Sequence, residues 1–275
     1  MTRHASVDKS VRPLTSADIP AVLVLSSAAG WNQTADDWKL LLQPGIGECL
    51  AIERDGRVVA TTTLVCYAQE LAWVGMVLTH PDFRNQGLAR RLVGASLMIA
   101  AEKTIRTVKL DATELGIQLY RSLGFREEQT IERWLGTGRL PSKSDQMPPL
   151  GMPDLELDRE AFGADRTRIL EFLAKRAAPL AAEDGFAMFR SGARASYIGP
   201  CVARSPESAK RLIGSCLRAN LREWYWDLLP SNRAAVDIAK GFNFKRERVL
   251  VRMVKGPDLK GNESLIYAGG GFEIG

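Results

Sequence analysis

The stretch from residue 73 to residue 93, WVGMVLTHPDFRNQGLARRLV, limits what this chain can fold into more than any other. Its apolar run at residues 74–78 predicts a buried strand. Pro81 ends that strand, because proline has no N–H group to donate to a ladder. Apolar residues then recur at helical spacing from Leu88 to Ile99. The sequence therefore predicts a strand, a basic turn that contains glycine, and a helix, in that order.

The turn between this strand and helix has the chemistry of an anion-binding site. N–H groups at the start of a helix lack partners within it and carry partial positive charge. Gly87 and Ala89 are small enough to let an anion approach the backbone, and Arg84 adds charged donors. We expect a pyrophosphate here, with an ordinary surface loop as the alternative. Neither the nucleotide P-loop pattern nor G-x-G-x-x-G is present.

The R-x-x-G-x-A turn directly after an apolar strand resembles motif A of the GNAT acyltransferases, where it binds the pyrophosphate of acetyl-CoA. The segment LDATELGIQLYRSLGF, residues 110–125, is similar to that family's later strand, helix and L-G-F turn. The resemblance implies acetyl-CoA as co-substrate, no metal, and a backbone N–H on the strand that meets the thioester carbonyl. The cofactor-binding residues that it implies are Met76, Val77, Leu78, Arg84, Asn85, Gln86, Gly87, Leu88, Ala89, Arg90 and Tyr120, with Val77 or Leu78 as the carbonyl donor.

Two side chains are candidates for catalysis. Tyr120 stands where many GNAT members carry the acid that protonates the departing thiolate, and the alternative is a tyrosine packed in the core. Asp111 ends a predicted strand at residues 106–112, where open α/β sheets expose functional groups. Asp111 is therefore our candidate for a carboxylate on the acceptor side, as general base or as the partner of a cationic substrate. Its alternative role is a helix N-cap.

Substrate-binding candidates lie on a loop between two predicted short helices. Trp31, Asn32 and Gln33 form an aromatic–amide cluster there, and the resemblance implies that this region covers the acceptor. Packing of Trp31 into the core is the alternative.

Composition narrows the classes of protein. The 275 residues allow one large domain or two ordinary ones, and the hydrophobic and charged fractions are those of a soluble globular protein. A net charge of +5 suits an anionic cofactor, but no nucleic-acid-binding motif is present. Four scattered cysteines and two histidines argue against a metal or disulfide framework. Without a leader or a membrane-length apolar run, we expect a cytoplasmic monomer or homodimer that binds neither nucleic acid nor membrane.

The order of elements predicts a mixed α/β sheet. Predicted strands at residues 49–54 and 58–66 flank Asp55-Gly56, a strong hairpin signal, and a βαβ unit follows. The GNAT resemblance implies that strands 71–78 and 106–112 splay apart around the pantetheine arm. We expect a disordered tail at residues 1–10, a catalytic domain at 1–140, a linker at 141–155 and a second domain at 156–275.

The second half repeats the first weakly. Predicted strands at 185–189, 195–199 and 222–229 and helices at 208–217 and 232–239 follow the same order, and a closing strand is expected at 265–275. The segment 200–206 lacks R-x-x-G-x-A, and Ala239 occupies the place of Tyr120. The expected fold is thus a tandem GNAT-like acyl-CoA N-acyltransferase fold whose second copy is degenerate and has no cofactor site.

These expectations combine into a function. The chain is expected to be an acetyl-CoA-dependent N-acetyltransferase that transfers acetyl directly to the amine of a small acceptor, with the second half walling the acceptor pocket. No cysteine or serine in the motifs suggests an acyl-enzyme. A non-catalytic acyl-CoA-binding or sensor protein is the alternative. A tandem enzyme with two working sites is a third possibility.

Overall fold

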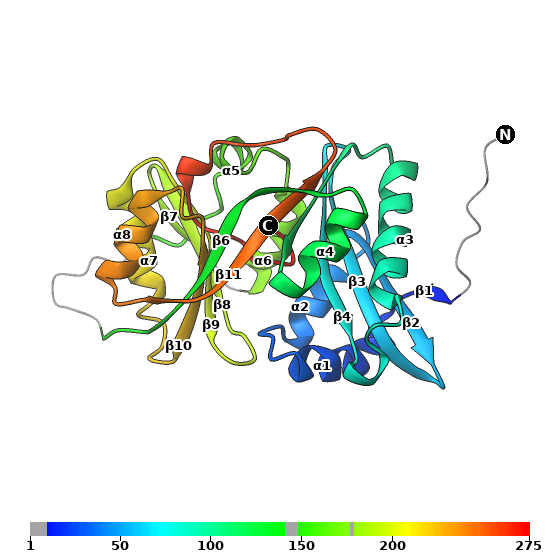
Figure 1. Cartoon of the computed structure of the whole chain (residues 1–275). Coiled ribbons are helices and arrows are strands. Elements are labelled where there is room, and N and C mark those ends of the chain that lie inside the picture. Colours follow the sequence, from blue (N-terminus) through cyan, green and yellow to red (C-terminus); the bar gives the residue numbers. More distant parts are fainter. Residues whose placement is uncertain (1–9, 141–147, 177–178) are drawn as a thin grey trace.

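The computed structural model describes residues 10–140, 148–176 and 179–275. Two lobes, one from each half of the chain, share a single mixed sheet (Figure 1). Residues 1–9 of the predicted tail and 141–147 of the predicted linker lie outside the described residues. The first half contains β1 (Val11–Pro13), η1 (Ser16–Asp18), α1 (Ile19–Ala28), α2 (Ala35–Leu41), β2 (Gly47–Arg54), β3 (Arg57–Tyr67), β4 (Leu71–Thr79), η2 (Pro81–Phe83), α3 (Leu88–Glu102), β5 (Thr107–Ala112), α4 (Glu114–Ser122) and β6 (Arg126–Thr137). The second half contains α5 (Leu155–Phe162), α6 (Thr167–Arg176), β7 (Leu180–Ala182), β8 (Gly185–Arg190), β9 (Ser196–Ala203), α7 (Pro206–Cys216), β10 (Glu223–Leu228), α8 (Arg233–Gly241), β11 (Lys245–Lys255), η3 (Glu263–Leu265) and β12 (Ile266–Ala268).

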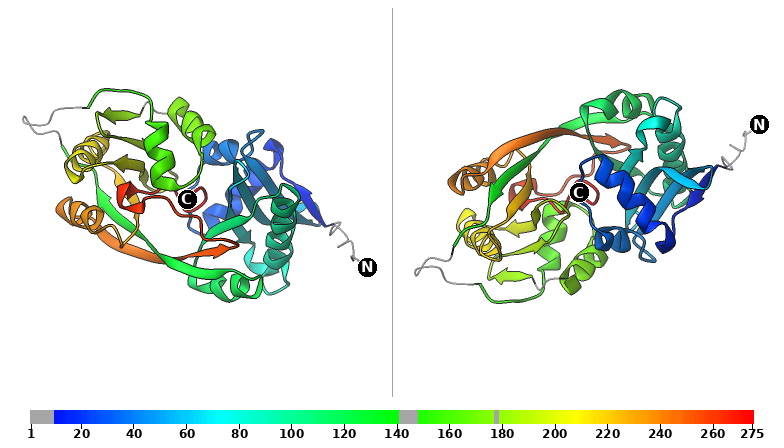
Figure 2. Two further views of the ribbon diagram at one scale, coloured as in Figure 1. Left: turned by 90° about the horizontal axis from the view of Figure 1, so that it is seen from above. Right: turned by 90° about the horizontal axis from the view of Figure 1, so that it is seen from below.

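The two halves exchange strands. The sheet order is β1-β2-β3-β4-β5-β11-β6-β10-β9-β8-β7, with β12 paired to β9. β11, from the second half, therefore lies between β5 and β6 of the first half, and β6 lies between β11 and β10 of the second. The antiparallel β6–β11 pair crosses from one lobe to the other (Figures 1 and 2). Each lobe thus completes its sheet with a strand from the other half of the chain.

In the first half, local sequence patterns form the hairpin and the helix that they predict. Asp55 and Gly56 both take positive φ, 51° and 73°, which is the backbone that a two-residue hairpin needs between β2 and β3. On α3 the buried residues Leu88, Leu92 and Ala100 follow helical spacing, and this face packs on β2, β3 and β4.

The predicted splay of the two parallel strands is confirmed. β4 and β5 pair only from Leu71 to Trp73 against residues 107–109, and no pairing continues beyond that point. The gap therefore opens toward the carboxyl ends of both strands, where the turn before α3 and the start of α4 lie.

The strands and helices predicted for the second half occur in the predicted order, but α5, β7 and β11 were not predicted. The gap of this half is filled by its own chain. β9 and β10 also pair in parallel over only three residues, 196–198 with 224–226. Beyond that point β12 pairs with β9, and the Gly269 N–H donates to the Asp227 carbonyl of β10 at 2.8 Å. The predicted closing strand over residues 265–275 is therefore wrong beyond Ile266–Ala268, because the glycines after it turn instead of extending.

A continuous apolar core joins the lobes. Trp38 and Trp73 of the first half belong to the same buried cluster as Leu170 and Phe186 of the second. No helix within the described ranges is long and apolar enough to cross a membrane.

Candidate functional site

The turn before α3 presents unpaired backbone donors. Within the described part of the chain, the amides of residues 85–90 donate no hydrogen bond. Asn85 and Gly87 have positive φ, 60° and 73°, so consecutive N–H groups turn outward instead of continuing β4. The residues of the turn are exposed, and a Cβ placed on Gly87 would meet nothing within 4 Å. The start of this helix is therefore open to an anion.

A bulge interrupts β4 inside the gap. Thr61 stands opposite Leu78 and Thr63 opposite Gly75. Met76 and Val77 therefore have no residue of β3 directly opposite them in the register. Met76 has φ 48°, unusual for a side chain of this size, and its carbonyl is held by the Thr61 hydroxyl at 2.8 Å. Of the two predicted carbonyl donors, Val77 lies in the bulge and Leu78 rejoins the β3 ladder.

A pocket of about 80 Å³ lies at this bulge. Its lining comes from both halves of the chain, since residues of β6, β11 and the C-terminal segment line it together with those of β4. The lining residues include Trp31, Gln33, Val74, Gly75, Met76, Val77, Asp111, Tyr120, Arg133, Arg248, Phe272 and Glu273. The pocket therefore brings together most of the predicted catalytic and substrate-binding residues.

Tyr120 lines the pocket from α4. It is 8% exposed and packs edge-on against Phe125, with Gly116 leaving room for its ring. Burial raises the pKa of its hydroxyl, and no hydrogen-bond partner for that hydroxyl is found among the described residues. A protonated donor is thus held at the edge of the pocket.

Asp111 lines the pocket, but an arginine occupies its carboxylate. Arg252 of β11 donates from Nε and Nη2 to its two oxygens at 2.9 and 3.1 Å, and the Asp111 side chain is fully buried. Burial raises the pKa of Asp111, while the Arg252 charge opposes the shift. The second half repeats this pair: Arg133 of β6 donates to both oxygens of Asp227 at 2.7 and 2.6 Å.

The repeat of this pair bears on the role of Asp111. Asp111 and Asp227 end equivalent parallel strands, and each is bound by the strand that the other half contributes. The same pair thus exists in the half whose gap is filled by its own chain. The feature that the two pairs share is that each binds an exchanged strand. The geometry therefore does not require Asp111 to act as a base, and that role stays a prediction.

The three predicted loop residues have different surroundings. Trp31 and Gln33 line the pocket, and Trp31 also packs against the core, which was the alternative weighed for it. Contact of either residue with the acceptor stays a prediction. Asn32 is buried and fastens the lobes instead: its Oδ1 accepts from the Arg194 and Ala195 amides at 2.9 and 3.0 Å.

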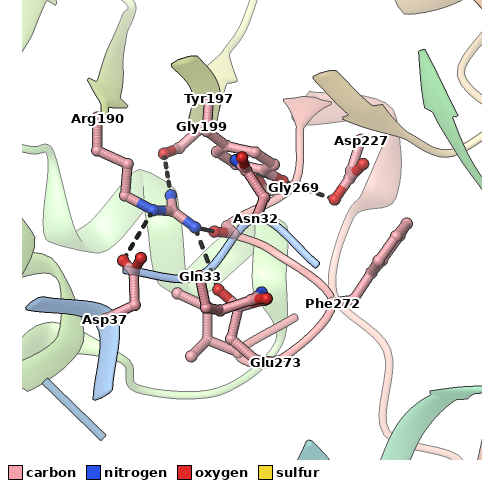
Figure 3. A network of polar contacts seen from close by, with 12 residues as sticks. Asn32, Gln33, Asp37, Arg190, Tyr197, Gly199, Asp227, Gly269, Phe272 and Glu273 are labelled. Atoms are coloured by element: carbon pink, nitrogen blue, oxygen red, sulfur yellow. Dashed lines mark hydrogen bonds and ion pairs between the residues drawn. The ribbon is translucent and has the colours of Figure 1, made fainter. Parts of the chain in front are cut away.

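The C-terminal segment brings in a residue that was not predicted. Glu273 is 6% exposed and lies in a polar network with Gln33, Asp37 and Arg190 (Figure 3). The chain reaches this position between the lobes after β12 (Figure 2). No local pattern in the glycine-rich sequence around Glu273 signals it.

The start of α7, the counterpart of α3, is closed. Ser205 caps the helix by accepting from the Ser208 amide, and its hydroxyl donates to Asp184 at 2.6 Å. Only residues 204 and 205 separate β9 from α7, so no loop is available to surround a phosphate. No cluster of three or more metal-binding side chains occurs in residues 10–140, 148–176 or 179–275.

Comparison with known families decides the assignment. One family model of the acetyltransferase (GNAT) domain matches residues 155–268, and a second one matches residues 45–127. The chain belongs to the GNAT acetyltransferases. Together the matches cover more than half of the sequence, one in each half, so this GNAT protein carries two domains of the family in tandem.

Individual relatives agree with this assignment. The uncharacterized N-acetyltransferase YitH of Bacillus subtilis (strain 168) is 26% identical over 176 residues, which cover 61% of this chain and 60% of YitH. A candidate acetyltransferase from Pyrococcus horikoshii has a solved structure with a TM-score of 0.87 and 22% identity, over 100% of this chain and 99% of that one. A tandem GNAT protein from the clavulanic acid biosynthesis pathway, solved without acetyl-CoA, has a TM-score of 0.62 and 15% identity, over 90% and 99%. The structural likenesses show the tandem GNAT fold.

Proposed function

We propose that this GNAT protein is an acetyl-CoA-dependent N-acyltransferase whose first half transfers acetyl directly to the amine of a small acceptor. One observation carries the proposal. Unpaired amides at residues 85–90 lie at the carboxyl end of β4, beside a gap that contains an unpaired bulge and the Tyr120 side chain. That combination fits an elongated molecule with a diphosphate at one end and a reactive carbonyl at the other.

In this proposal, backbone donors and one charge hold the diphosphate. The amides of residues 85–90 and the exposed Arg84 guanidinium would bind its oxygens, because the helix start favours negative charge there. Met76, Val77 and Leu78 would line the pantetheine arm, as predicted. The Val77 N–H, which lies in the bulge of β4, would donate to the thioester oxygen as it gains negative charge during attack.

Tyr120 is proposed as the acid. Its hydroxyl is protonated at neutral pH, and burial raises its pKa further, so a proton is available to a thiolate that develops beside it. Neither cysteine nor serine lines the pocket within the described ranges, which supports direct attack by the amine. An acyl-CoA sensor would share the open turn, but it would have no need of an unpaired tyrosine hydroxyl in the pocket.

One site per chain and a small acceptor complete the proposal. The second half has a filled gap and a capped α7, which supports a single working site. Elements of both lobes close the pocket, and this favours a small amine over a protein tail.

The proposal is tested by a thermal-shift titration with CoA, followed by an amine screen. CoA should raise the melting temperature of the wild type and of Arg57→Glu, an exposed control at the start of β3, and should not affect Arg84→Glu. Acetyl-CoA with a panel of amines should then release free thiol. A normal CoA shift in Arg84→Glu refutes the phosphate site, and CoA binding without turnover of any amine favours the sensor.

A further inference from the structure

The C-terminal segment fixes a carboxylate beside the bulge of β4. Trp73 Nε1 donates to the Phe272 carbonyl at 2.9 Å, which ties the segment to β4. Gly75 has no side chain where Glu273 passes, and a Cβ there would lie 2.9 Å from the Glu273 Cα. The Glu273 backbone is therefore packed directly against the residue before the bulge, and its side chain lines the same pocket as Val77 and Tyr120.

The partners of Glu273 leave it available to a ligand. Gln33 Nε2 donates to Oε2 at 3.0 Å, and Arg190 Nη2 donates to Oε1 over a longer distance of 3.3 Å. Arg190 is shared, since it also donates to the Gly270 carbonyl at 2.9 Å and faces Asp37 at 3.5 Å (Figure 3). Asp111, in contrast, has both oxygens bound by one arginine.

Gln33 contributes an acceptor without a donor. Because its Nε2 must face the carboxylate, which accepts only, its Oε1 is fixed on the other side. Oε1 is buried and has no hydrogen-bond partner among the described residues. A buried amide oxygen beside a carboxylate suits an ammonium group, which brings three donors and a positive charge.

A second charge in the pocket constrains the rest of the acceptor. Arg133 and Arg248 both line it, and Arg133 is neutralised by Asp227. Arg248, exposed on β11, has no ion-pair or hydrogen-bond partner among the described residues. An unpaired guanidinium attracts an anionic group and repels a second cation.

We propose that Glu273 is the proton acceptor for the substrate amine, and that the acceptor is a primary amine that also carries an anionic group, as amino acids do, with Arg248 binding that group. This inference rests on the proposed function. It assigns the base to the C-terminal segment of the second half, while the acyl donor is held by the first.

The proposed step balances as follows. The substrate ammonium gives one proton to the Glu273 carboxylate, which passes it to solvent, and the neutral nitrogen attacks the thioester carbonyl carbon. The C–N bond forms and the C–S bond breaks, while the nitrogen loses a second proton to solvent, from which Tyr120 regains the one that it gives to the thiolate. The thiolate takes up one proton through Tyr120. The products are the N-acetyl amine, the free thiol of CoA and one proton.

Charges around Glu273 are compatible with this role. Burial raises its pKa, Arg190 and Arg133 lower it, and Asp37 raises it. A raised pKa brings a carboxylate nearer to neutral pH, where a general base is most effective.

The test compares Glu273→Gln with Glu207→Gln, an exposed control on α7, using acetyl-CoA and a panel of free amino acids and polyamines. Glu273→Gln should keep the wild-type CoA thermal shift and lose about 10²-fold in kcat at neutral pH. That loss should shrink as the pH rises toward the pKa of the acceptor amine, where no base is needed. Arg248→Gln should raise KM for amino acids with little change in kcat.

The possible outcomes are distinct. Wild-type kcat in Glu273→Gln, or a loss that is the same at every pH, refutes Glu273 as the base and leaves the proposed function intact. Faster turnover of polyamines than of amino acids, or an unchanged KM in Arg248→Gln, refutes the anionic acceptor. A wild-type chain that binds CoA and acetylates no amine refutes the proposed function and this inference with it.

Discussion

We expect the substitution Asp111→Asn to lower the stability of the fold, because it leaves Arg252 without its charged partner. The carboxylate accepts two bonds, at 2.9 and 3.1 Å, from a guanidinium whose side chain is 7% exposed, and the other face of Arg252 lies over the Trp73 ring. Asn carries no charge, so the substitution leaves a buried cation without its partner. Breaking such a pair costs about 3–5 kcal/mol. At ~2 °C per kcal/mol for a chain of this length, Tm should fall by about 6–10 °C.

Thermal melts followed by circular dichroism measure this effect. Asp227→Asn, the counterpart in the other lobe, should lower Tm by a similar amount, and the exposed Asp237→Asn on α8 should not. Adding Arg252→Gln to Asp111→Asn should restore part of the loss, because the unpaired cation is gone. If Asp111→Asn keeps the wild-type Tm and CoA shift but acetylates no amine, its carboxylate acts on the acceptor and the fastening role is wrong.

Three further outcomes are expected. Tyr120→Phe should lower kcat by about 10²-fold while CoA still shifts the melting temperature, and unchanged kcat would remove its role as acid. Calorimetric titration with CoA should give one site per chain, since the second gap is filled; two sites would contradict that account. Burial raises the pKa of Cys49 and Cys216 to about 12, so both thiols stay protonated at neutral pH and should label with Ellman's reagent only after unfolding. Rapid labelling of either residue in the native chain would refute this.

Much of the first half could be predicted because its signals are local. A strand, a turn and a helix within a single stretch of residues determine the open amides at 85–90, and Asp55-Gly56 determines its own hairpin. The family resemblance supplied the splay of β4 from β5, which depends on no single residue. These features need no knowledge of distant parts of the chain.

The acceptor side depends on contacts that are far apart in sequence. β11 was not predicted as a strand, and nothing in residues 245–255 specifies that its neighbours are β5 and β6. Asp111 meets its arginine 141 positions later, and Gln33 meets Glu273 240 positions later. One signal was present: Arg252 is flanked by apolar residues, and an arginine in such a strand needs a buried carboxylate.

The exchange of β6 and β11 also governs how the protein is made. A ribosome releases the chain from the N-terminus, so β5 has no neighbour on its open side until residues 245–255 have been synthesised. During that interval the nascent first half presents a bare strand edge, the kind of surface that recruits other chains. Completion of the sheet of the first lobe is therefore tied to the synthesis of β11, in the second half of the chain.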